Sequence, residues 1–485
     1  MKPDNHMGNI IDCVLIIPFY KALRGPFKVF DNIYPPLSLC YLSAYLKKSG
    51  FTTLVVDCNI EFRKHEEFET FLKNLSATTQ VKYVGYTAAT ATINSAIDSS
   101  RIFKKYFPGT GVIFGGPHVN FDYTEIMSHY WIDYSVIGEG ELTLNEIVSG
   151  KAPSEIDGLV YRTAEGSIVK NKERSRIENI DILPFPDYEA LKIDKYNVIQ
   201  AVPLYKTPSV GIITSRGCPG NCTFCSRTIR GKTVNHSATY VYDLIQWLIE
   251  IYKIKQVVFL DDTFTDNRKF VSDLCMLMIN NDLKLVWTCQ SRIDTIDTSL
   301  LALMKKAGCV LISYGVESLD DGILKSINKK INTAQITDII RKTHEAKILS
   351  RTYIMVGHLN DNHQTIKTTI KRLKSLKTDF VTVQVSSPLP GSALFEQAKK
   401  LNLIKSTNWD HYDWSFLVMK HPVLTEKEIY KYINKIYLSF YLRLPFLLKM
   451  IKMINTIEGM KKVIKGVIVY IKLLKEQLMI MLVKK

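Results

Sequence analysis

Hydrophobic and polar positions follow a repeating pattern through the first part of the chain. Five short runs rich in β-branched residues are separated by segments whose apolar residues recur at helical spacing. Strands that alternate with helices build a parallel sheet with helices on both faces. The pattern therefore predicts an α/β domain over residues 1–150, a Rossmann-like doubly wound parallel sheet, with strands at 13–19, 52–58, 82–87, 111–116 and 134–140.

The pattern changes after this block and then returns. Residues 151–205 contain a predicted hairpin, GLVYRTAEGSIVK, and a proline-bearing stretch, which together indicate a linker. Six further strands, each with room for one crossover helix, predict a partial (β/α)6 barrel over residues 206–400. We place them at 209–215, 256–262, 285–292, 310–318, 351–357 and 380–390, with a helical region at 401–485.

Polar residues and glycines gather where the strands of the second block end. Parallel βα units bring all their carboxyl ends to one rim, where such folds build active sites. Along a strand, side chains alternate between faces, so Arg292 and Cys289 point in opposite directions. Cys289 is therefore predicted to be core, as are Cys13, Cys40, Cys58, Cys275 and Cys309, whereas the rim holds Cys218, Cys222, Cys225, Asp261, Asp262, Arg292, Glu317, Gly357 and residues 388–391.

The first block carries its own candidate ligand residues at the strand ends. Open α/β sheets bind ligands beyond the carboxyl ends of their strands. The G-x-G-x-x-G fingerprint is absent after the first strand, which disfavours a nicotinamide or flavin cofactor. Tight turns alone are the alternative explanation for the glycines. The candidates are Thr87, Gly115, Gly116, His118, Gly138, Glu139, Gly140 and Glu141.

Composition indicates the cellular compartment. The 485 residues are 46 % hydrophobic. The odd number of cysteines, nine, and the polar first residues argue against a disulfide framework and favour a protein of the reducing cytoplasm. No apolar run approaches the roughly 18 residues of a membrane span. The net charge is +16, but residues 441–485 carry ten Lys or Arg and two Glu, which argues against a nucleic-acid surface. This tail predicts a basic amphipathic helix that packs on the body or contacts a membrane surface.

Three cysteines lie within eight residues in the sequence CPGNCTFC, which begins at Cys218. Structural zinc sites close with four ligands, and no second cysteine or histidine pair follows at suitable spacing, so zinc is disfavoured. A [4Fe-4S] cube normally takes four thiolates. Three would leave one iron open to a small molecule, and Gly217 and Gly220 let the loop fold around the cluster.

This C-x3-C-x2-C motif resembles that of the radical S-adenosylmethionine (SAM) superfamily. The resemblance implies a [4Fe-4S] cluster held by Cys218, Cys222 and Cys225, and reductive cleavage of SAM to a 5′-deoxyadenosyl radical. It further implies that three rim segments contact SAM: FLDDTF near the amino group, CQSRID at the carboxylate and YGVESLDDGILKSINK at the nucleoside. The segment SPLPGSALFEQAKKLNLI resembles the family's sixth-strand end. The residues implied are Asp261, Asp262, Arg292, Gly315 and Glu317.

The first block resembles the cobalamin-binding domains fused to radical enzymes, through YPPLSLCYLSAYLKKSGF, GGPH and GEGELTLNEI. Two departures stand out. The D-x-H-x-x-G motif is missing, so cobalamin would bind without a lower axial histidine, or be absent. The fifth strand of the second block ends in VGHLNDN, where relatives usually show a glycine-proline turn.

The resemblance implies a cobalamin-dependent radical SAM enzyme that methylates an unactivated carbon of a small, hydrophobic natural product or lipid. Cyclisation, rearrangement or carbon-carbon coupling by the same domains is the alternative, and a tRNA-modifying or RNA-binding protein is a further one. Without an aromatic-basic stacking motif, RNA is disfavoured. The expected partners are the small-molecule substrate and an external electron donor of flavodoxin or ferredoxin type.

Overall fold

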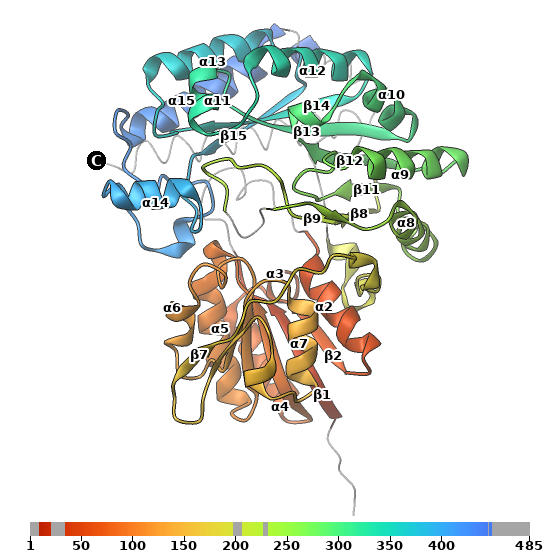
Figure 1. Ribbon diagram of the computed structural model, residues 1–485, viewed down its shortest axis with the longest axis vertical. Helices are drawn as coiled ribbons and strands as arrows, with labels where there is room; N and C mark the ends of the chain where they lie inside the picture. The colour runs from red at the N-terminus through yellow and green to blue at the C-terminus, as the bar shows by residue number, and fades with distance from the viewer. Residues whose placement is uncertain (1–8, 21–33, 197–205, 227–230, 445, 449–485) are drawn as a thin grey trace, which may run out of the picture. The chain divides into compact units, whose positions relative to one another are not determined.

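The computed structural model describes residues 9–20, 34–196, 206–226, 231–444 and 446–448. Contacts divide the chain into two compact units (Figure 1). The first comprises residues 1–21 and 35–196, and the second comprises residues 22–34 and 197–485. Most of the expected amphipathic tail lies outside the described residues.

The first unit is built on a seven-stranded sheet in the order β2-β1-β3-β4-β5-β6-β7. Strands β1 to β5 are parallel, and the chain reverses its direction of strand addition at β1 and β3, which makes the sheet doubly wound. The strands and helices are β1 Asn9–Ile17, α2 Leu37–Lys48, β2 Thr53–Asp57, α3 Cys58–Glu61, α4 His65–Ser76, β3 Thr79–Thr87, α5 Ile93–Tyr106, β4 Gly111–Gly115, α6 Tyr123–Met127, β5 Tyr134–Val136, α7 Gly140–Val148, β6 Leu159–Arg162 and β7 Ile168–Lys170.

Both faces of this sheet are buried. Leu15 and Ile16 are neighbours on β1 and point to opposite faces, yet each is at most 1 % exposed. Helices α2 and α7 pack together over the face that holds Leu15, and α4 packs with α5. The sequence of β-branched strands without polar alternation requires this two-sided cover.

The region expected to be a linker is partly built into the first unit. Strands β6 and β7 form the predicted hairpin, but β6 pairs antiparallel with β5 and so extends the sheet. The proline-bearing stretch that follows is tied back to the unit. Asp187 accepts a hydrogen bond from Ser43 and pairs with Lys47 at 2.7 Å, and the Tyr196 hydroxyl donates to Asp57 at 2.9 Å.

The second unit has a six-stranded parallel sheet in the order β15-β14-β13-β12-β11-β8, so each strand lies beside the one before it in sequence. This is the expected partial (β/α)6 barrel. Its elements are β8 Ser209–Ile212, β9 Ser215–Arg216, β10 Val234–Asn235, α8 Ala238–Tyr252, β11 Gln256–Phe259, α9 Arg268–Asn280, β12 Val286–Ser291, α10 Thr298–Lys306, β13 Cys309–Glu317, α11 Asp321–Ser326, α12 Thr333–Glu345, β14 Leu349–Val356, α13 His363–Ser375, β15 Phe380–Val385, α14 Ala393–Lys400 and α15 Glu426–Tyr441.

The edge strand β15 is covered by helix α15. The Tyr437 hydroxyl accepts from the Val383 amide at 2.9 Å and donates to its carbonyl at 3.2 Å. The Tyr441 hydroxyl makes the same pair of contacts with Val381, at 3.2 and 2.9 Å. These tyrosines satisfy backbone groups that an open sheet edge would expose.

None of the helices in the described ranges combines the length and apolar character that crossing a membrane requires.

Candidate functional site

The cysteine-bearing loop follows β8 and β9 at the carboxyl rim of the second sheet. A Cβ atom built on Gly220 would lie 3.3 Å from the Cys218 sulfur, 4.0 Å from the Cys222 sulfur and 3.1 Å from Nη1 of Arg292. A side chain at this position would therefore fill the space that the two sulfurs and the guanidinium border. The Cys225 amide donates to the Cys222 carbonyl at 3.3 Å, which places the third cysteine on the same turn.

The described residues contain no group of three or more His, Cys, Asp or Glu side chains gathered closely enough to hold a metal ion. All nine cysteines lie within the described residues, and none forms a disulfide. The six predicted to be core are confirmed as such, since each is at most 2 % exposed. Of the loop cysteines, Cys218 and Cys225 are partly accessible, whereas Cys222 is buried with 6 % of its surface exposed.

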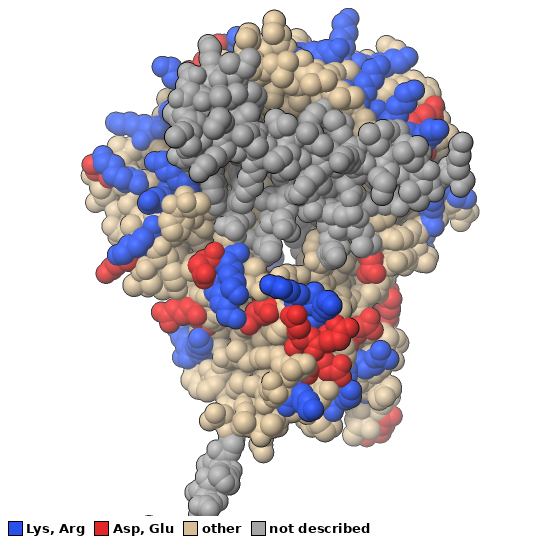
Figure 2. Space-filling model, turned by 180° about the vertical axis from the view of Figure 1, so that it is seen from behind, with Lys and Arg blue, Asp and Glu red and all other residues tan. Residues whose placement is uncertain are grey.

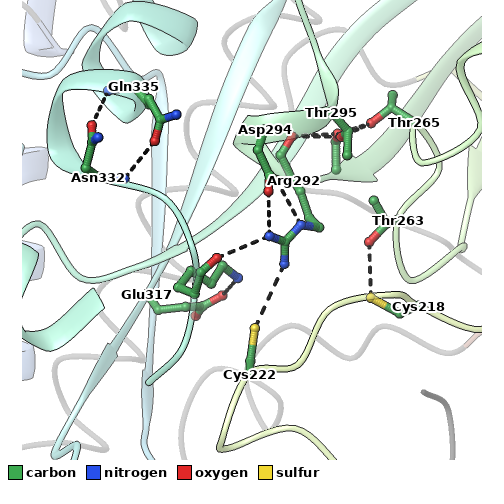
Figure 3. Close-up of polar contacts among 12 residues, drawn as sticks. Cys218, Cys222, Thr263, Thr265, Arg292, Asp294, Thr295, Glu317, Asn332 and Gln335 are labelled. Atoms are coloured by element: carbon green, nitrogen blue, oxygen red, sulfur yellow. Dashed lines mark hydrogen bonds and ion pairs between the residues drawn. The ribbon is translucent and has the colours of Figure 1, made fainter. Parts of the chain in front are cut away.

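Arg292 directly follows strand β12 and reaches toward the loop (Figure 3). Its Nε and Nη2 donate to Asp294 at 2.8 and 2.7 Å, Nη2 also donates to the Lys329 carbonyl at 3.1 Å, and Nη1 lies 4.0 Å from the Cys222 sulfur. Burial lowers the pKa of Arg292, but the Asp294 carboxylate, together with the nearby Cys222 and Cys218, outweighs burial and the net pKa is raised. A fixed positive charge therefore stands beside the cysteines.

Glu317 ends strand β13 and forms an ion pair that the sequence did not reveal. Lys329 donates to its carboxylate at 2.8 Å, and the two side chains are only 9 % and 7 % exposed. A Cβ on Gly315 would lie 2.8 Å from the Glu317 carboxylate and 3.0 Å from the lysine nitrogen. Gly315 therefore leaves the room that this buried pair occupies.

Asp261 follows strand β11 and is 1 % exposed. Its Oδ1 accepts from the Thr214 amide at 2.9 Å, the Thr214 hydroxyl at 3.0 Å and the Ser215 hydroxyl at 2.5 Å. Its Oδ2 is buried and has no hydrogen-bond partner among the described residues. Burial raises the pKa of Asp261 to about 6. Asp262, by contrast, is exposed at the rim.

A hydroxyl lines the loop on this side. The Cys218 sulfur lies 3.6 Å from the Thr263 hydroxyl (Figure 3). The structure thus brings the segments that follow β8, β11, β12 and β13 to one rim, as we predicted from the alternation of strands and helices in the sequence.

In the first unit, the ends of β3 and β4 lie side by side. Thr87 pairs with Gly115, and a Cβ on Gly116 would lie 2.8 Å from the Ala88 amide nitrogen. The Gly116 φ of +103° also suits glycine alone. His118 is fully buried, its Nδ1 lies 3.2 Å from the Thr90 hydroxyl, and burial lowers its pKa to about 4.

The turn after β5 is tied to this place by Asn120, a residue that the strand-end analysis missed. Its amide donates to the Gly116 carbonyl at 3.2 Å, and its oxygen accepts from the Gly138 amide at 2.7 Å. Glu139 accepts from the Ile177 amide at 2.7 Å, so its carboxylate is already engaged by the chain. Gly140 begins α7, where a Cβ would lie 3.2 Å from Leu42.

Charged side chains of both signs are interspersed on the face of the molecule in Figure 2. Among the described residues, several charged side chains are paired: Arg341 contacts both Asp338 and Glu345, and Lys192 contacts Glu61 at 3.0 Å.

Residues 212–373 match the Radical SAM superfamily, and residues 24–148 match the B12 binding domain. The first match spans the cysteine loop, Arg292 and Glu317, and the second spans the ends of β3, β4 and β5. Each match thus falls on one of the two sets of strand ends described above.

An uncharacterized methyltransferase of Pyrococcus horikoshii is 33 % identical, over 87 % of this chain and 91 % of that protein. An anaerobic magnesium-protoporphyrin IX monomethyl ester cyclase of Rubrivivax gelatinosus is 26 % identical, over 90 % of this chain and 78 % of that protein.

Two solved structures share the fold. The cobalamin-dependent SAM radical enzyme OxsB, solved with aqua-cobalamin and SAM, matches with a TM-score of 0.72 and 15 % identity over 98 % of this chain and 72 % of its own. The radical SAM methyltransferase TsrM of Kitasatospora setae, solved with cobalamin and a [4Fe-4S] cluster, gives 0.69 and 14 % over 89 % of each chain. On the domain matches and the Pyrococcus relative together, this chain belongs to the radical SAM superfamily and carries a B12-binding domain ahead of its radical SAM domain.

Proposed function

We propose that this chain, a cobalamin-dependent radical SAM enzyme, methylates an unactivated carbon of a small, hydrophobic natural product or lipid. Membership of the family implies the cofactors, which are a [4Fe-4S] cluster, SAM and cobalamin. The Pyrococcus relative aligns with 87 % of this chain and is named an uncharacterized methyltransferase, which supports methylation as the reaction. The cyclase relative favours one alternative, ring formation by the same domains. The observation that carries the proposal is the pair of sulfurs around Gly220, beside Arg292 at the carboxyl rim.

The donor atoms of the loop suit an iron-sulfur cluster, although the three cysteines are not gathered closely enough in this structure to hold a metal ion. Thiolates are the donors that iron-sulfur clusters take, and the absence of a side chain at Gly220 leaves space between two of the three sulfurs. Cys218, Cys222 and Cys225 would hold it, with a fourth iron left for SAM. When bound, the cluster supplies the electron that cleaves SAM and the cobalamin carries the methyl group.

The chain's own residues would bind and orient SAM. The unsatisfied Oδ2 of Asp261 and the exposed carboxylate of Asp262 are acceptors suited to an ammonium group. Arg292 offers a guanidinium held in place by Asp294, which suits a carboxylate. Glu317, with Gly315 beside it, would accept from ribose hydroxyls while its carboxylate also accepts from Lys329.

Seven residues of the first unit are the proposed cobalamin contacts. Gly116 and Gly138 have positive φ angles of +103° and +85°, and a Cβ on Gly138 would meet nothing within 4 Å, so its backbone stays open to a ligand. Buried His118 stays neutral, which suits hydrogen bonding rather than charge pairing. The full set is Thr87, Gly115, Gly116, His118, Gly138, Glu139 and Gly140.

Anaerobic reconstitution with iron and sulfide tests the cluster. The parent chain is expected to gain broad absorbance near about 400 nm, and single Ala substitutions at Cys218, Cys222 or Cys225 are expected to abolish or strongly reduce it. Cys289→Ala is the matched control, because Cys289 is buried in the sheet. A parent chain without this absorbance, or loop variants that keep it, would refute the assignment.

The reaction type is tested by product mass. Metabolites of a deletion strain are compared with those of its parent, and the molecule that disappears is compared with the one that accumulates. The molecule that disappears is the product. If it is heavier than the accumulated molecule by one CH2 unit, the reaction is methylation. If it is lighter by two hydrogens, the reaction is cyclisation and the methyltransferase proposal is refuted.

A further inference from the structure

The turn after β14 departs from the glycine-proline sequence expected at this position, and the structure shows what replaces it. The Asp361 carboxylate accepts from the amides of Gly357 and His358 at 2.9 and 3.0 Å, and from the Thr365 hydroxyl at 3.0 Å. Gly357 has a φ of +93°. A buried carboxylate therefore orders this turn through hydrogen bonds, whereas a proline would restrict the turn through its ring.

A second group holds the turn from the opposite side. His421 Nε2 donates to the His358 carbonyl at 2.8 Å, while its Nδ1 accepts from the amides of Val423 and Leu424 at 3.1 and 2.9 Å. These contacts fix which nitrogen of His421 carries the proton. The backbone of His358 is therefore held at both its amide and its carbonyl, by groups from two different segments.

The imidazole that this turn presents is buried and incompletely paired. His358 is 2 % exposed, and its Nδ1 lies 3.3 Å from the Ser386 hydroxyl at the end of β15. Its Nε2 is buried and has no hydrogen-bond partner among the described residues. Buried polar atoms are nearly always paired, so an unpaired nitrogen on a fixed backbone indicates a missing partner.

His358 lies among the rim residues already described. Its ring centroid is 5.9 Å from that of Phe224, which lies between Cys222 and Cys225 in the loop. The Lys329 nitrogen, paired with Glu317, lies 5.8 Å from the same Phe224 ring. A continuous set of contacts therefore runs from the cysteine loop and the Glu317–Lys329 pair to His358.

Charge distinguishes the part of SAM that suits this position. Burial, together with the nearby Lys329 and His421, lowers the pKa of His358 to about 3, so its ring is neutral. The methionine part of SAM is zwitterionic and calls for the charged groups of Arg292 and Asp261. The nucleoside is neutral and offers hydroxyls and ring nitrogens, which a neutral imidazole between an aromatic ring and a serine can recognise.

We propose that His358 Nε2 hydrogen-bonds the nucleoside of SAM and so positions it beside the cysteine loop. This inference rests on the proposed function, because it takes SAM as the ligand of the rim. It adds a residue, and a turn held by Asp361 and His421, to the contacts that the family resemblance implies.

Two substitutions separate the two ring nitrogens. The amide of His358→Gln can place a polar atom near the position of Nε2, whereas that of His358→Asn reaches only the position of Nδ1 and the Ser386 contact. The exposed His344 on α12 provides the matched control, His344→Asn. SAM binding is measured by anaerobic calorimetry on the reconstituted full chain, with the absorbance spectrum recorded for each sample.

His358→Asn is expected to weaken SAM binding about tenfold, the effect of losing one buried hydrogen bond, and His358→Gln to stay within about threefold of the parent. His344→Asn should bind as the parent does. Equal affinities for all four proteins, or an Asn variant that binds better than the Gln variant, would overturn the inference, since a purely structural role through Ser386 favours Asn. A parent chain with no cluster absorbance would overturn the proposed function, and this inference with it.

Discussion

Removing one partner of the buried Glu317–Lys329 pair is expected to destabilise the second unit strongly. At 2.8 Å and an effective dielectric constant of about 20, the attraction between the two charges is about 6 kcal/mol. Burial of both side chains offsets much of this, because taking two ions out of water costs several kcal/mol each. The pair therefore adds little net stability while intact, but each charge depends on the other.

The single variants Glu317→Gln and Lys329→Met each leave one buried charge without its partner. Each is expected to lower the free energy of unfolding by about 3 to 5 kcal/mol. The double variant leaves no buried charge, so it should lose no more than either single variant. The interaction energy of the cycle is then at least about 3 kcal/mol, well above the additivity error of about 0.5 kcal/mol.

Urea unfolding of the apo chain, followed by tryptophan fluorescence, measures these changes. Urea is uncharged and so leaves the ionic screening of the pair unchanged. The signal reports mainly the second unit, because four of the five tryptophans lie there: Trp247, Trp287, Trp409 and Trp414. A double variant as unstable as the sum of the two singles would show that the two charges do not depend on one another.

Three further substitutions test separate parts of the fold. Burial raises the pKa of Asp361 from 3.8 to about 6, so the parent chain loses stability as the pH rises through that window. The free energy of unfolding of Asp361→Asn minus that of the parent, measured with urea, should therefore be larger at about pH 7 than at about pH 4.5, by about 2 kcal/mol. A constant difference between variant and parent would contradict this. Tyr437→Phe should cost about 1 to 3 kcal/mol in the same assay, because it leaves the Val383 amide and carbonyl unpaired, and no loss would mean that water replaces the hydroxyl. Tyr196→Phe removes the hydrogen bond to Asp57 and should lower the free energy of unfolding of the first unit by a similar amount, measured by circular dichroism. An unchanged free energy would show that this bond does not hold the segment before Tyr196 to the first unit.

The positions of the rim residues could be predicted because they depend on local pattern. Strand and helix periods place the carboxyl ends of consecutive parallel strands together, whatever the details of packing. Arg292 and Glu317 were found in this way, and the structure places Lys329 in contact with both: its carbonyl accepts from Arg292 and its ammonium donates to Glu317. The same reasoning identified Cys289 as core from side-chain alternation alone.

Lys329 and His358 could not be assigned from the sequence, because what buries them is distant along the chain. Nothing in SINKK marks one lysine as buried, and lysine is usually exposed. Its partner is twelve residues earlier, beyond α11, whereas the turn at His358 is held by a histidine 63 residues later. Such contacts are set by tertiary packing, which no periodicity encodes.

The end of the first unit could not be predicted from the sequence either. A hairpin with proline-bearing flanks has the composition of a linker, and only its antiparallel pairing with β5 shows that it completes the sheet. Strand β1 also begins earlier than predicted, at Asn9 instead of Cys13. The added residues include Asp12, whose carboxylate accepts from the amide and the hydroxyl of Thr52, and such contacts are not visible in apolar periodicity.

The backbone conformation at Glu317 is irregular. Glu317 has a φ of +69°, a conformation that costs a non-glycine residue of the order of 1 to 3 kcal/mol. The register between β13 and β14 shifts at the same place, between Gly315 and Glu317. The irregularity turns an acidic side chain back over a glycine and onto a buried lysine, an arrangement that a regular strand of the same length would not produce. The strained residue opposes stability and the buried ion pair adds little to it, so neither feature serves the fold itself, and their joint presence supports the proposal that a ligand binds at this rim.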